Sequence, residues 1–335
     1  MRAAVLLNDT RCDRHHGCDL VVECILATAE KAGIRIVATA PAHCDWQSSS
    51  SFTAAFSAAD LIIVNGEGTV HHDRPSARYL LNAGVEAQRL GKPSALINTT
   101  WYRNGTRFAE LAASFDLISV RESTSAMELK QSGLSARIVP DLALLTSMPE
   151  GATRAGIAYS DCVVASTALQ LHERMHHTDA EFLSMFHQPN RFRSLLRTAR
   201  RYARVKTKSD PVSTIASIRL ALIEARSEFK DRDTFLTSIA SKKLIVTGRF
   251  HMMVLAMASR TPFLVIESNT PKCTATLTDS GLARWRSVRE EEITPELMKR
   301  ASLWEADEPH HLEAFISSGK EKMERLFADL VTLQP

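Results

Sequence analysis

One stretch of the chain combines a short apolar run, a turn and a helix with two side chains suited to chemistry. Residues 244–246 are apolar and rich in branched side chains, which predicts a buried parallel strand. The next two residues, Thr-Gly, predict a turn, and from Phe250 the apolar residues continue for the length of a helix without two-residue alternation. Arg249 and His251 therefore fall at the start of this helix.

The start of a helix attracts anions, because its first N–H groups lack partners and its dipole is positive there. The Arg249 guanidinium adds a fork-shaped donor for a carboxylate or a phosphate. His251 can bind an anion when it is protonated, or move a proton near neutral pH. The structural alternative is that Arg249 forms a salt bridge and His251 caps the helix. Both interpretations stay open on these residues alone.

A second group of titratable side chains follows another expected strand, at residues 60–65. Here the sequence continues as Gly-Glu-Gly-Thr-Val-His-His-Asp, with Glu67 between two glycines that let the backbone approach a ligand closely. The dinucleotide-binding fingerprint would need a third glycine. Glu67, His71 and Asp73 are candidate catalytic groups. Metal binding by the two histidines and the aspartate has no diagnostic spacing, and we expect no metal.

Three further junctions between strands and helices carry polar side chains. Arg121 lies between an expected strand and an expected helix, close to Ser125, which can cap the helix or donate to an anion. Lys272 is the third cation at such a junction. A polar loop with His15 and His16 leads to a helix for which Asp19 is the expected N-cap. Open α/β sheets bind ligands at such loops, although a solvated loop explains the pattern equally well.

These side chains are positioned by short apolar runs that alternate with amphipathic stretches. The alternation predicts an α/β fold of two doubly wound, Rossmann-like domains at 1–148 and 149–335, facing each other across a cleft. A helical insertion is expected at about 176–242. The expected strands are 3–7, 34–38, 60–65, 94–98, 116–120, a short strand from 137, 155–159, 244–246 and 262–266, and the expected helices are 20–32, 52–59, 77–90, 108–114, 126–132, 178–187, 190–205, 212–227, 231–240, 273–280 and 313–333.

Composition limits the classes of function. The 335 residues are too many for one ordinary α/β core, and a formal charge of +3 gives no overall preference for polyanions. Aromatic residues make up 6%, which argues against a base-stacking platform, so we expect no nucleic-acid partner. No run approaches the roughly 20 apolar residues that span a bilayer. The six cysteines form no CxxC pair, and reduced thiols in the cytoplasm are the default.

The insertion carries a basic run at 191–208, with apolar side chains between its arginines and lysines. Such a helix could contact anionic lipid on the inner face of the membrane. A solvated basic face is an equal alternative.

Four fragments in order along the chain resemble the polysaccharide pyruvyl transferase family. They are Asn65-Gly-Glu-Gly-Thr-Val-His-His-Asp73, Arg121-Glu-Ser-Thr-Ser125 with Pro140-Asp141, Thr247-Gly-Arg-Phe-His251, and Pro271-Lys272. Asn8 and Gly17-Cys-Asp19 are similar to the start of the family's sequences. The resemblance implies a fold like that of two-domain GT-B glycosyltransferases. It also implies transfer of pyruvate from phosphoenolpyruvate to sugar hydroxyls.

The resemblance implies roles for individual residues. Arg249 and His251 match the family's Arg-x-His, and Arg121 with Ser125 matches its Arg-x-x-x-Ser, so all four would contact phosphoenolpyruvate. That donor carries a carboxylate and a phosphate, which need clustered cations. The expected donor-binding residues are Arg121, Arg249, Lys272 and Ser125; the expected catalytic residues are His251, Glu67, Asp73 and His71; and the expected acceptor-binding residues are His15, His16, Asp19, His72 and Trp101.

We therefore expect a cytoplasmic pyruvyl transferase of cell-envelope polysaccharide biosynthesis. It would need no cofactor besides phosphoenolpyruvate as co-substrate, and its acceptor would be a glycan or a lipid-linked sugar. His251 would protonate the donor, and Glu67, His71 or Asp73 would deprotonate the acceptor. Two alternatives stay open: a GT-B glycosyltransferase that uses a nucleotide sugar, and a non-catalytic relative that binds glycans or anions.

Overall fold

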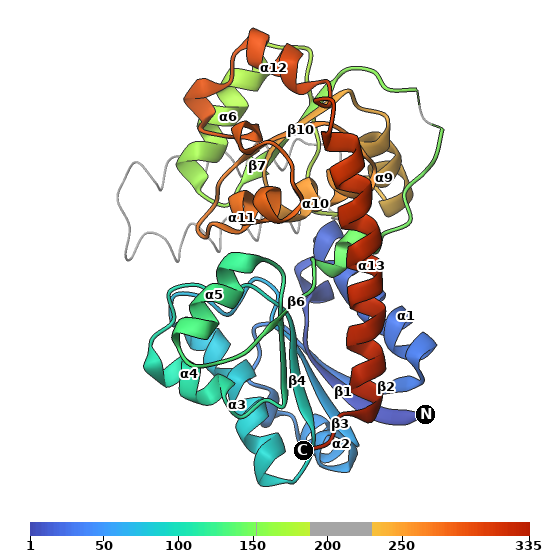
Figure 1. The fold of residues 1–335 in the computed structure, drawn as a ribbon, viewed down its shortest axis with the longest axis vertical. Helices are drawn as coiled ribbons and strands as arrows, with labels where there is room; N and C mark the ends of the chain where they lie inside the picture. The colour runs from blue at the N-terminus through green and yellow to red at the C-terminus, as the bar shows by residue number, and fades with distance from the viewer. Residues whose placement is uncertain (152, 188–229) are drawn as a thin grey trace. The chain divides into compact units, whose positions relative to one another are not determined.

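The computed structural model describes residues 1–151, 153–187 and 230–335, and its chain forms two compact units (Figure 1). Unit 1 consists of Met1–Asp13, Cys18–Thr146 and Glu313–Pro335, and unit 2 of Arg14–Gly17 and Ser147–Leu312. The chain passes from one unit to the other after Thr146, close to the expected boundary at 148. Two segments depart from the expected division. Residues 14–17 belong to unit 2, and the end of the chain belongs to unit 1.

Unit 1 contains a six-stranded parallel sheet with the order β2-β1-β3-β4-β5-β6. Its strands are β1 (Arg2–Asp9), β2 (Ile34–Pro41), β3 (Leu61–Asn65), β4 (Ser94–Thr99), β5 (Leu117–Val120) and β6 (Arg137–Ile138). After β2 the chain crosses to the other side of β1 and adds the remaining strands there. The carboxyl ends of β1 and β3 therefore form the switch point of unit 1, where the winding direction reverses.

Helices cover both faces of this sheet, with α3, α4 and α5 on one face and α1 and α13 on the other (Figure 1). Their bounds are α1 (His16–Ala32), α2 (Ser50–Ala58), α3 (Pro75–Arg89), α4 (Thr106–Ala112), α5 (Ser123–Gln131) and α13 (Glu308–Thr332). The Arg2 guanidinium donates to the carbonyls of Leu330, Val331 and Leu333, which holds the end of α13 against β1. The expectation that Asp19 is an N-cap is wrong, because α1 begins at His16 and Asp19 lies in its first turn.

Unit 2 contains a five-stranded parallel sheet with the order β11-β10-β9-β7-β8. The strands are β7 (Ile157–Cys162), β8 (Glu181–Phe182), β9 (Leu244–Gly248), β10 (Phe263–Ile266) and β11 (Ser287–Val288). The helices are α6 (Ala165–His176), α9 (Arg232–Ala240), α10 (Phe250–Ala258), α11 (Lys272–Asp279) and α12 (Pro295–Ala301). Counted from β7, the strands follow the same order as the first five strands of unit 1. The carboxyl ends of β7 and β9 form its switch point.

Short 3-10 helices complete the two units. They are η1 (Thr10–Asp13), η2 (Trp46–Ser48), η3 (Leu142–Leu145), η4 (Arg284–Arg286) and η5 (Glu290–Glu292). The expected α/β class is confirmed by two parallel sheets with helices.

The expected helix at 178–187 is wrong. The hydroxyl of Thr178 donates to the Met175 carbonyl just past the end of α6, and the chain continues into the short strand β8. The expected helix at 231–240 is confirmed by α9. The expected helices at 190–205 and 212–227 lie outside the described residues, as does the basic run at 191–208.

Candidate functional site

The switch point of unit 2 holds a salt bridge between two strand ends. Asp161 lies near the end of β7, and Arg249 follows β9. Arg249 donates from Nε to Asp161 Oδ1 at 2.8 Å and from Nη2 to Oδ2. The Asp161 side chain is 7% exposed and that of Arg249 is 20% exposed. Two parallel hydrogen bonds fix the plane of the guanidinium, while part of it stays accessible to solvent.

The helix after this strand starts as the sequence predicts. Arg249 is the N-cap residue of α10, and its side chain makes no capping hydrogen bond. Gly248 is required for the approach of β9 to β7, because a Cβ there would lie 2.1 Å from the Cys162 sulfur. The positive dipole end of α10 therefore begins at the residue that carries the guanidinium.

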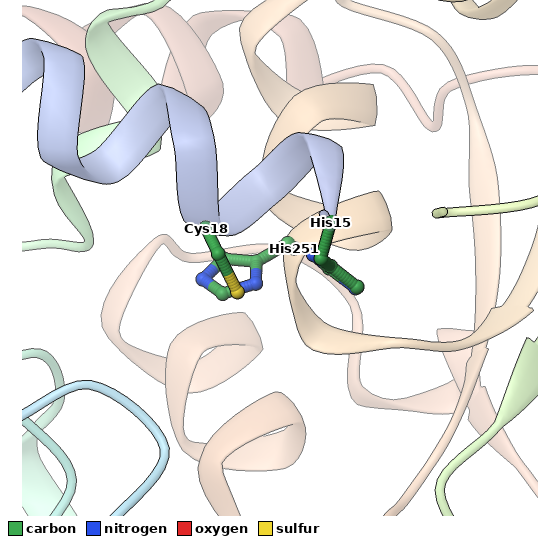
Figure 2. Close-up of side chains that lie close together, drawn as sticks. All are labelled: His15, Cys18 and His251. Atoms are coloured by element: carbon green, nitrogen blue, oxygen red, sulfur yellow. The ribbon is translucent and has the colours of Figure 1, made fainter. Parts of the chain in front are cut away.

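His251, in the first turn of α10, contacts a segment from near the start of the sequence. The His15 ring lies edge-on to the His251 ring with a centroid separation of 5.6 Å (Figure 2). A Cβ on Gly17 would lie 2.3 Å from the Cβ of His251, so only glycine fits at that position. The third residue labelled in Figure 2, Cys18, is the first residue of the next segment of unit 1.

His15 and His16 were expected to bind the acceptor, but the structure buries both of them within unit 2. Burial, reinforced by the charges of His251 and Arg249, lowers the pKa of His15 well below its usual value. His16 stacks on Phe235 with a centroid separation of 4.0 Å, and burial lowers its pKa to about 4. Both imidazoles are therefore neutral at neutral pH.

Lys272 also belongs to unit 2, as the first residue of α11. Its ammonium lies 5.8 Å from the centroid of the Phe250 ring, at the start of α10. The start of α11 itself already holds a carboxylate, because Glu267 accepts hydrogen bonds from the N–H groups of Cys273 at 3.3 Å and Thr274 at 2.8 Å. Between the starts of α10 and α11, that of α10 is thus the better place for an external anion.

Arg121, the remaining expected cation, lies in unit 1 between β5 and α5. Its guanidinium donates to Asp141 at 2.8 Å and to the Thr100 hydroxyl at 2.5 and 3.1 Å. Both side chains of the ion pair are nearly inaccessible, at 2% and 1% exposure. Arg121 therefore ties together three loops at the carboxyl edge of the sheet, and it offers almost no surface to a ligand in this arrangement.

Ser125 and Trp101 are likewise engaged inside unit 1. The Ser125 hydroxyl donates to Glu122, the N-cap of α5, and accepts from the Trp101 backbone N–H at 2.8 Å. Trp101 is 1% exposed and packs in the hydrophobic core of the unit. The sequence did not reveal this burial, because a tryptophan in a polar loop belongs to no periodic apolar pattern that would assign it to a core. Trp101 offers little surface to an acceptor.

The switch point of unit 1 contains a buried hydrogen-bond network around Glu67. The Glu67 carboxylate accepts from the hydroxyl of Thr10 at 3.0 Å and from the Asn65 amide at 3.4 Å. Asn8 donates to the Asn65 carbonyl at 2.7 Å, and Asn98 donates to the Asn65 side chain at 3.4 Å. Sequence reasoning missed Asn65 and Asn98 as members of the site. Their signal is positional, because three asparagines end or nearly end three neighbouring strands, β1, β3 and β4.

The loop after Glu67 carries the other expected catalytic residues of unit 1. His71 is 3% exposed, and its Nδ1 lies 2.8 Å from Nδ1 of His72, which is exposed. The Asp73 carboxylate accepts from the backbone N–H of Gly105 at 2.9 Å, at the start of α4. His72 and Asp73 both have left-handed backbone angles, with φ of 55° and 49°. The structure therefore brings Glu67 to the strand ends and gives Asp73 a role in holding the neighbouring loop.

No helix in the described part of the chain is long and apolar enough to cross a membrane.

Comparison with known proteins agrees with this architecture. A family model described as "Polysaccharide pyruvyl transferase" matches residues 15–270. No curated protein matches the chain. A solved UDP-N-acetylglucosamine 2-epimerase is 14% identical, with 100% of this chain and 98% of its own covered and a TM-score of 0.52. The S. aureus MnaA–UDP co-structure is 11% identical with coverage of 100% and 99% and a TM-score of 0.52. The Methanocaldococcus jannaschii UDP-GlcNAc 2-epimerase is 11% identical with coverage of 99% and 100% and a TM-score of 0.51. At these identities the similarity is one of fold, which is of the GT-B type.

Proposed function

The chain belongs to the polysaccharide pyruvyl transferase family and is a transferase, and we propose that it moves pyruvate from phosphoenolpyruvate onto sugar hydroxyls. The acceptor is a cell-surface polysaccharide or its lipid-linked precursor. The observation that carries the proposal is the start of α10, where a guanidinium fixed by Asp161 and an imidazole follow one strand end. The guanidinium suits an anionic donor, and the imidazole suits a reaction that needs a proton transfer.

Donor binding is assigned to unit 2. The exposed part of the Arg249 guanidinium and the N–H groups at the start of α10 bind the carboxylate or phosphate of phosphoenolpyruvate. Lys272, at the first position of α11 and near Phe250, adds a second positive charge. Arg121 and Ser125 then act indirectly, by fixing the carboxyl edge of unit 1.

The proposed reaction converts phosphoenolpyruvate and two sugar hydroxyls into a ketal and phosphate. A proton from His251 joins the enol CH2 and makes it a methyl group, and a sugar hydroxyl attacks the carbon that has become cationic. A second hydroxyl then displaces phosphate from that carbon, which completes the ketal. Of the two hydroxyl protons, one leaves with the phosphate. The other is taken by the base that activates the acceptor and passes from it to solvent, from which the imidazole regains its proton. Positioned cations stabilise the departing phosphate.

Glu67 is the proposed base for the acceptor, with His71 as the other candidate. Its carboxylate lies at the switch point of unit 1, where parallel sheets bind ligands. The Asp73 carboxylate already accepts from the Gly105 N–H, so we rank it below Glu67 and His71.

The test is incubation of the full chain with phosphoenolpyruvate and a panel of glycans that carry pairs of neighbouring hydroxyls. The proposal expects phosphate release that depends on the acceptor, with formation of a ketal detected by mass spectrometry. The His251→Gln variant should keep donor binding and lose turnover. Release of nucleotide from nucleotide sugars instead would indicate a glycosyltransferase. Glycan binding without turnover on either donor would indicate a non-catalytic relative.

The same proposal includes a location in the cytoplasm, with peripheral contact between residues 191–208 and an anionic membrane. Flotation of the chain with anionic liposomes tests it. Binding that is lost in the double variant Arg200→Glu with Arg201→Glu supports the contact, and absence of binding removes it.

A further inference from the structure

Four residues from near the start of the sequence form part of unit 2. The His16 N–H donates to the Met185 carbonyl at 2.9 Å, and the His187 N–H donates to the Arg14 carbonyl at 3.0 Å. These bonds flank an antiparallel bridge between His15 and Phe186. The segment Arg14–Gly17 therefore pairs in antiparallel fashion with the segment that follows β8, through backbone hydrogen bonds.

This pairing places His15 between Phe186 and His251. The His15 ring lies edge-on to the Phe186 ring, with centroids 5.2 Å apart and planes at 84°. Its centroid also lies 5.6 Å from that of the His251 ring. His15 is 7% exposed, so surrounding atoms leave the ring little freedom. An imidazole held in this way limits the orientations that a neighbouring ring can adopt.

The same phenyl ring also contacts the expected donor-binding side chain. The Arg249 guanidinium carbon lies 5.5 Å from the Phe186 ring centroid, and Asp161 binds the guanidinium by two hydrogen bonds. Arg249 and His15 are thus both set against Phe186. The positions of Arg249 and His251 are coupled through these contacts as well as through the backbone of α10.

Gly17 completes the enclosure of His251. A side chain at that position would overlap the Cβ of His251 at 2.3 Å and its Cγ at 2.5 Å. The absence of a side chain lets the start of α1 pack directly on the histidine. The four-residue segment thereby contacts His251 at two points, through the His15 ring and through the backbone at Gly17.

We propose that His15 is a positioning residue, which holds the His251 imidazole in one orientation beside Arg249 through its own contact with Phe186. This inference rests on the proposed role of His251 as proton donor. The charged and titratable groups around His15 include His251, Arg249, His16, His187 and the thiol of Cys18. A neutral His15 adds no further positive charge beside this guanidinium, so the donor anion is bound by Arg249 rather than by His15.

The experiment compares the full-length variants His15→Ala and His15→Phe with the wild type, using phosphoenolpyruvate and the best acceptor. His15→Ala removes the ring and should lower kcat about 10- to 100-fold, because a small misplacement of a catalytic group has effects of this size. KM for phosphoenolpyruvate should change by less than about threefold. His15→Phe keeps an aromatic edge against His251 and should recover most of kcat. An unchanged kcat in His15→Ala, or an equal loss in both variants, would overturn the proposal.

A second readout does not depend on activity. The imidazole NMR signals of His251, assigned with His251→Gln, should shift or broaden in His15→Ala and stay close to the wild type in His15→Phe. His187→Gln is the matched control, because His187 packs on the His16 ring and its loss should leave the His251 signals unchanged.

If the wild type lacks pyruvyl transfer but the His251 signals respond to His15→Ala, the proposed function fails and the contact stands. Signals that do not respond refute the positioning role, whatever the activity. If His15→Ala does not fold, His15→Phe and Gly17→Ala carry the test, and Gly17→Ala should displace the His251 signals.

Discussion

The two switch points share a strand order but hold opposite chemistry. In unit 1, the ends of β1 and β3 carry amides, a hydroxyl and the Glu67 carboxylate in a buried network. In unit 2, the ends of β7 and β9 carry the Asp161–Arg249 pair and lead to His251. Topology therefore locates a site in each unit, whereas the side chains after the strands determine what each site can bind.

The two arginines at strand ends show the difference most clearly. Both follow a strand, precede a helix and pair with an aspartate. Arg121 has 2% of its side chain exposed and Arg249 has 20%. A buried guanidinium holds loops together, while a partly exposed one of the same type can also meet a ligand. The following predictions test whether this contrast in exposure separates a structural arginine from a functional one.

The largest expected effect is on the stability of unit 1. Arg121→Met leaves the Asp141 carboxylate buried without its guanidinium partner, which should lower the free energy of unfolding by about 3–5 kcal/mol. Urea denaturation of the full chain measures it. The double variant Arg121→Met with Asp141→Leu should regain much of the loss. A single variant within about 1 kcal/mol of the wild type would show that the pair contributes little.

The second effect concerns pH and unit 2. His16 has a pKa of about 4 when folded, against a usual value of 6.5. The unfolded chain therefore binds the proton first as pH falls. The contribution of neutral His16 to the free energy of unfolding should be complete above pH 6.5. It should decrease by about 3 kcal/mol as the pH falls to about 4. His15 acts in the same direction. His16→Phe keeps the stack on Phe235 and should flatten this dependence; an unchanged slope in urea titrations at several pH values would assign the effect to other groups.

The third effect is on the reaction. Arg249→Lys keeps the positive charge but loses the bidentate hydrogen bonds to Asp161. The value of kcat/KM for phosphoenolpyruvate should therefore fall about 100-fold, with little change in melting temperature. Steady-state kinetics with varied donor measure this. Arg103→Lys, on an exposed arginine of unit 1, is the control and should have no effect. Wild-type kinetics in Arg249→Lys would place the donor away from α10.

The smallest effect contrasts the carboxylate at the start of α11 with an exposed ion pair of the same unit. Glu267→Ala removes the carboxylate that accepts from the Cys273 and Thr274 N–H groups, which should lower unfolding free energy by about 1 kcal/mol. Glu291→Ala, which breaks only an exposed ion pair with Arg289, should change it by less than about 0.5 kcal/mol. Equal values for the two variants in urea denaturation would mean that Glu267 does not cap α11 to any measurable extent.

Much of the fold follows from local sequence. Short apolar runs rich in branched side chains, such as those of β3 and β9, are typical of buried strands, and the intervening amphipathic stretches are typical of the helices that cover them. The ordered fragments around Glu67, Arg121 and His251 were enough to indicate the family. The helix predicted at 178–187 failed because a two-residue strand has too little pattern to compete with helix propensity.

The sequence by itself determined the two series of strands, the places where they end and the side chains that follow them, because periodicity and strand length are local properties. Only the tertiary structure decided that Arg121 is buried with Asp141 while Arg249 stays partly exposed, since burial depends on what packs above each residue. It also decided that Arg14–Gly17 joins unit 2 and brings His15 to His251. No local pattern encodes a contact between residues so far apart, because it arises from backbone pairing with a distant segment.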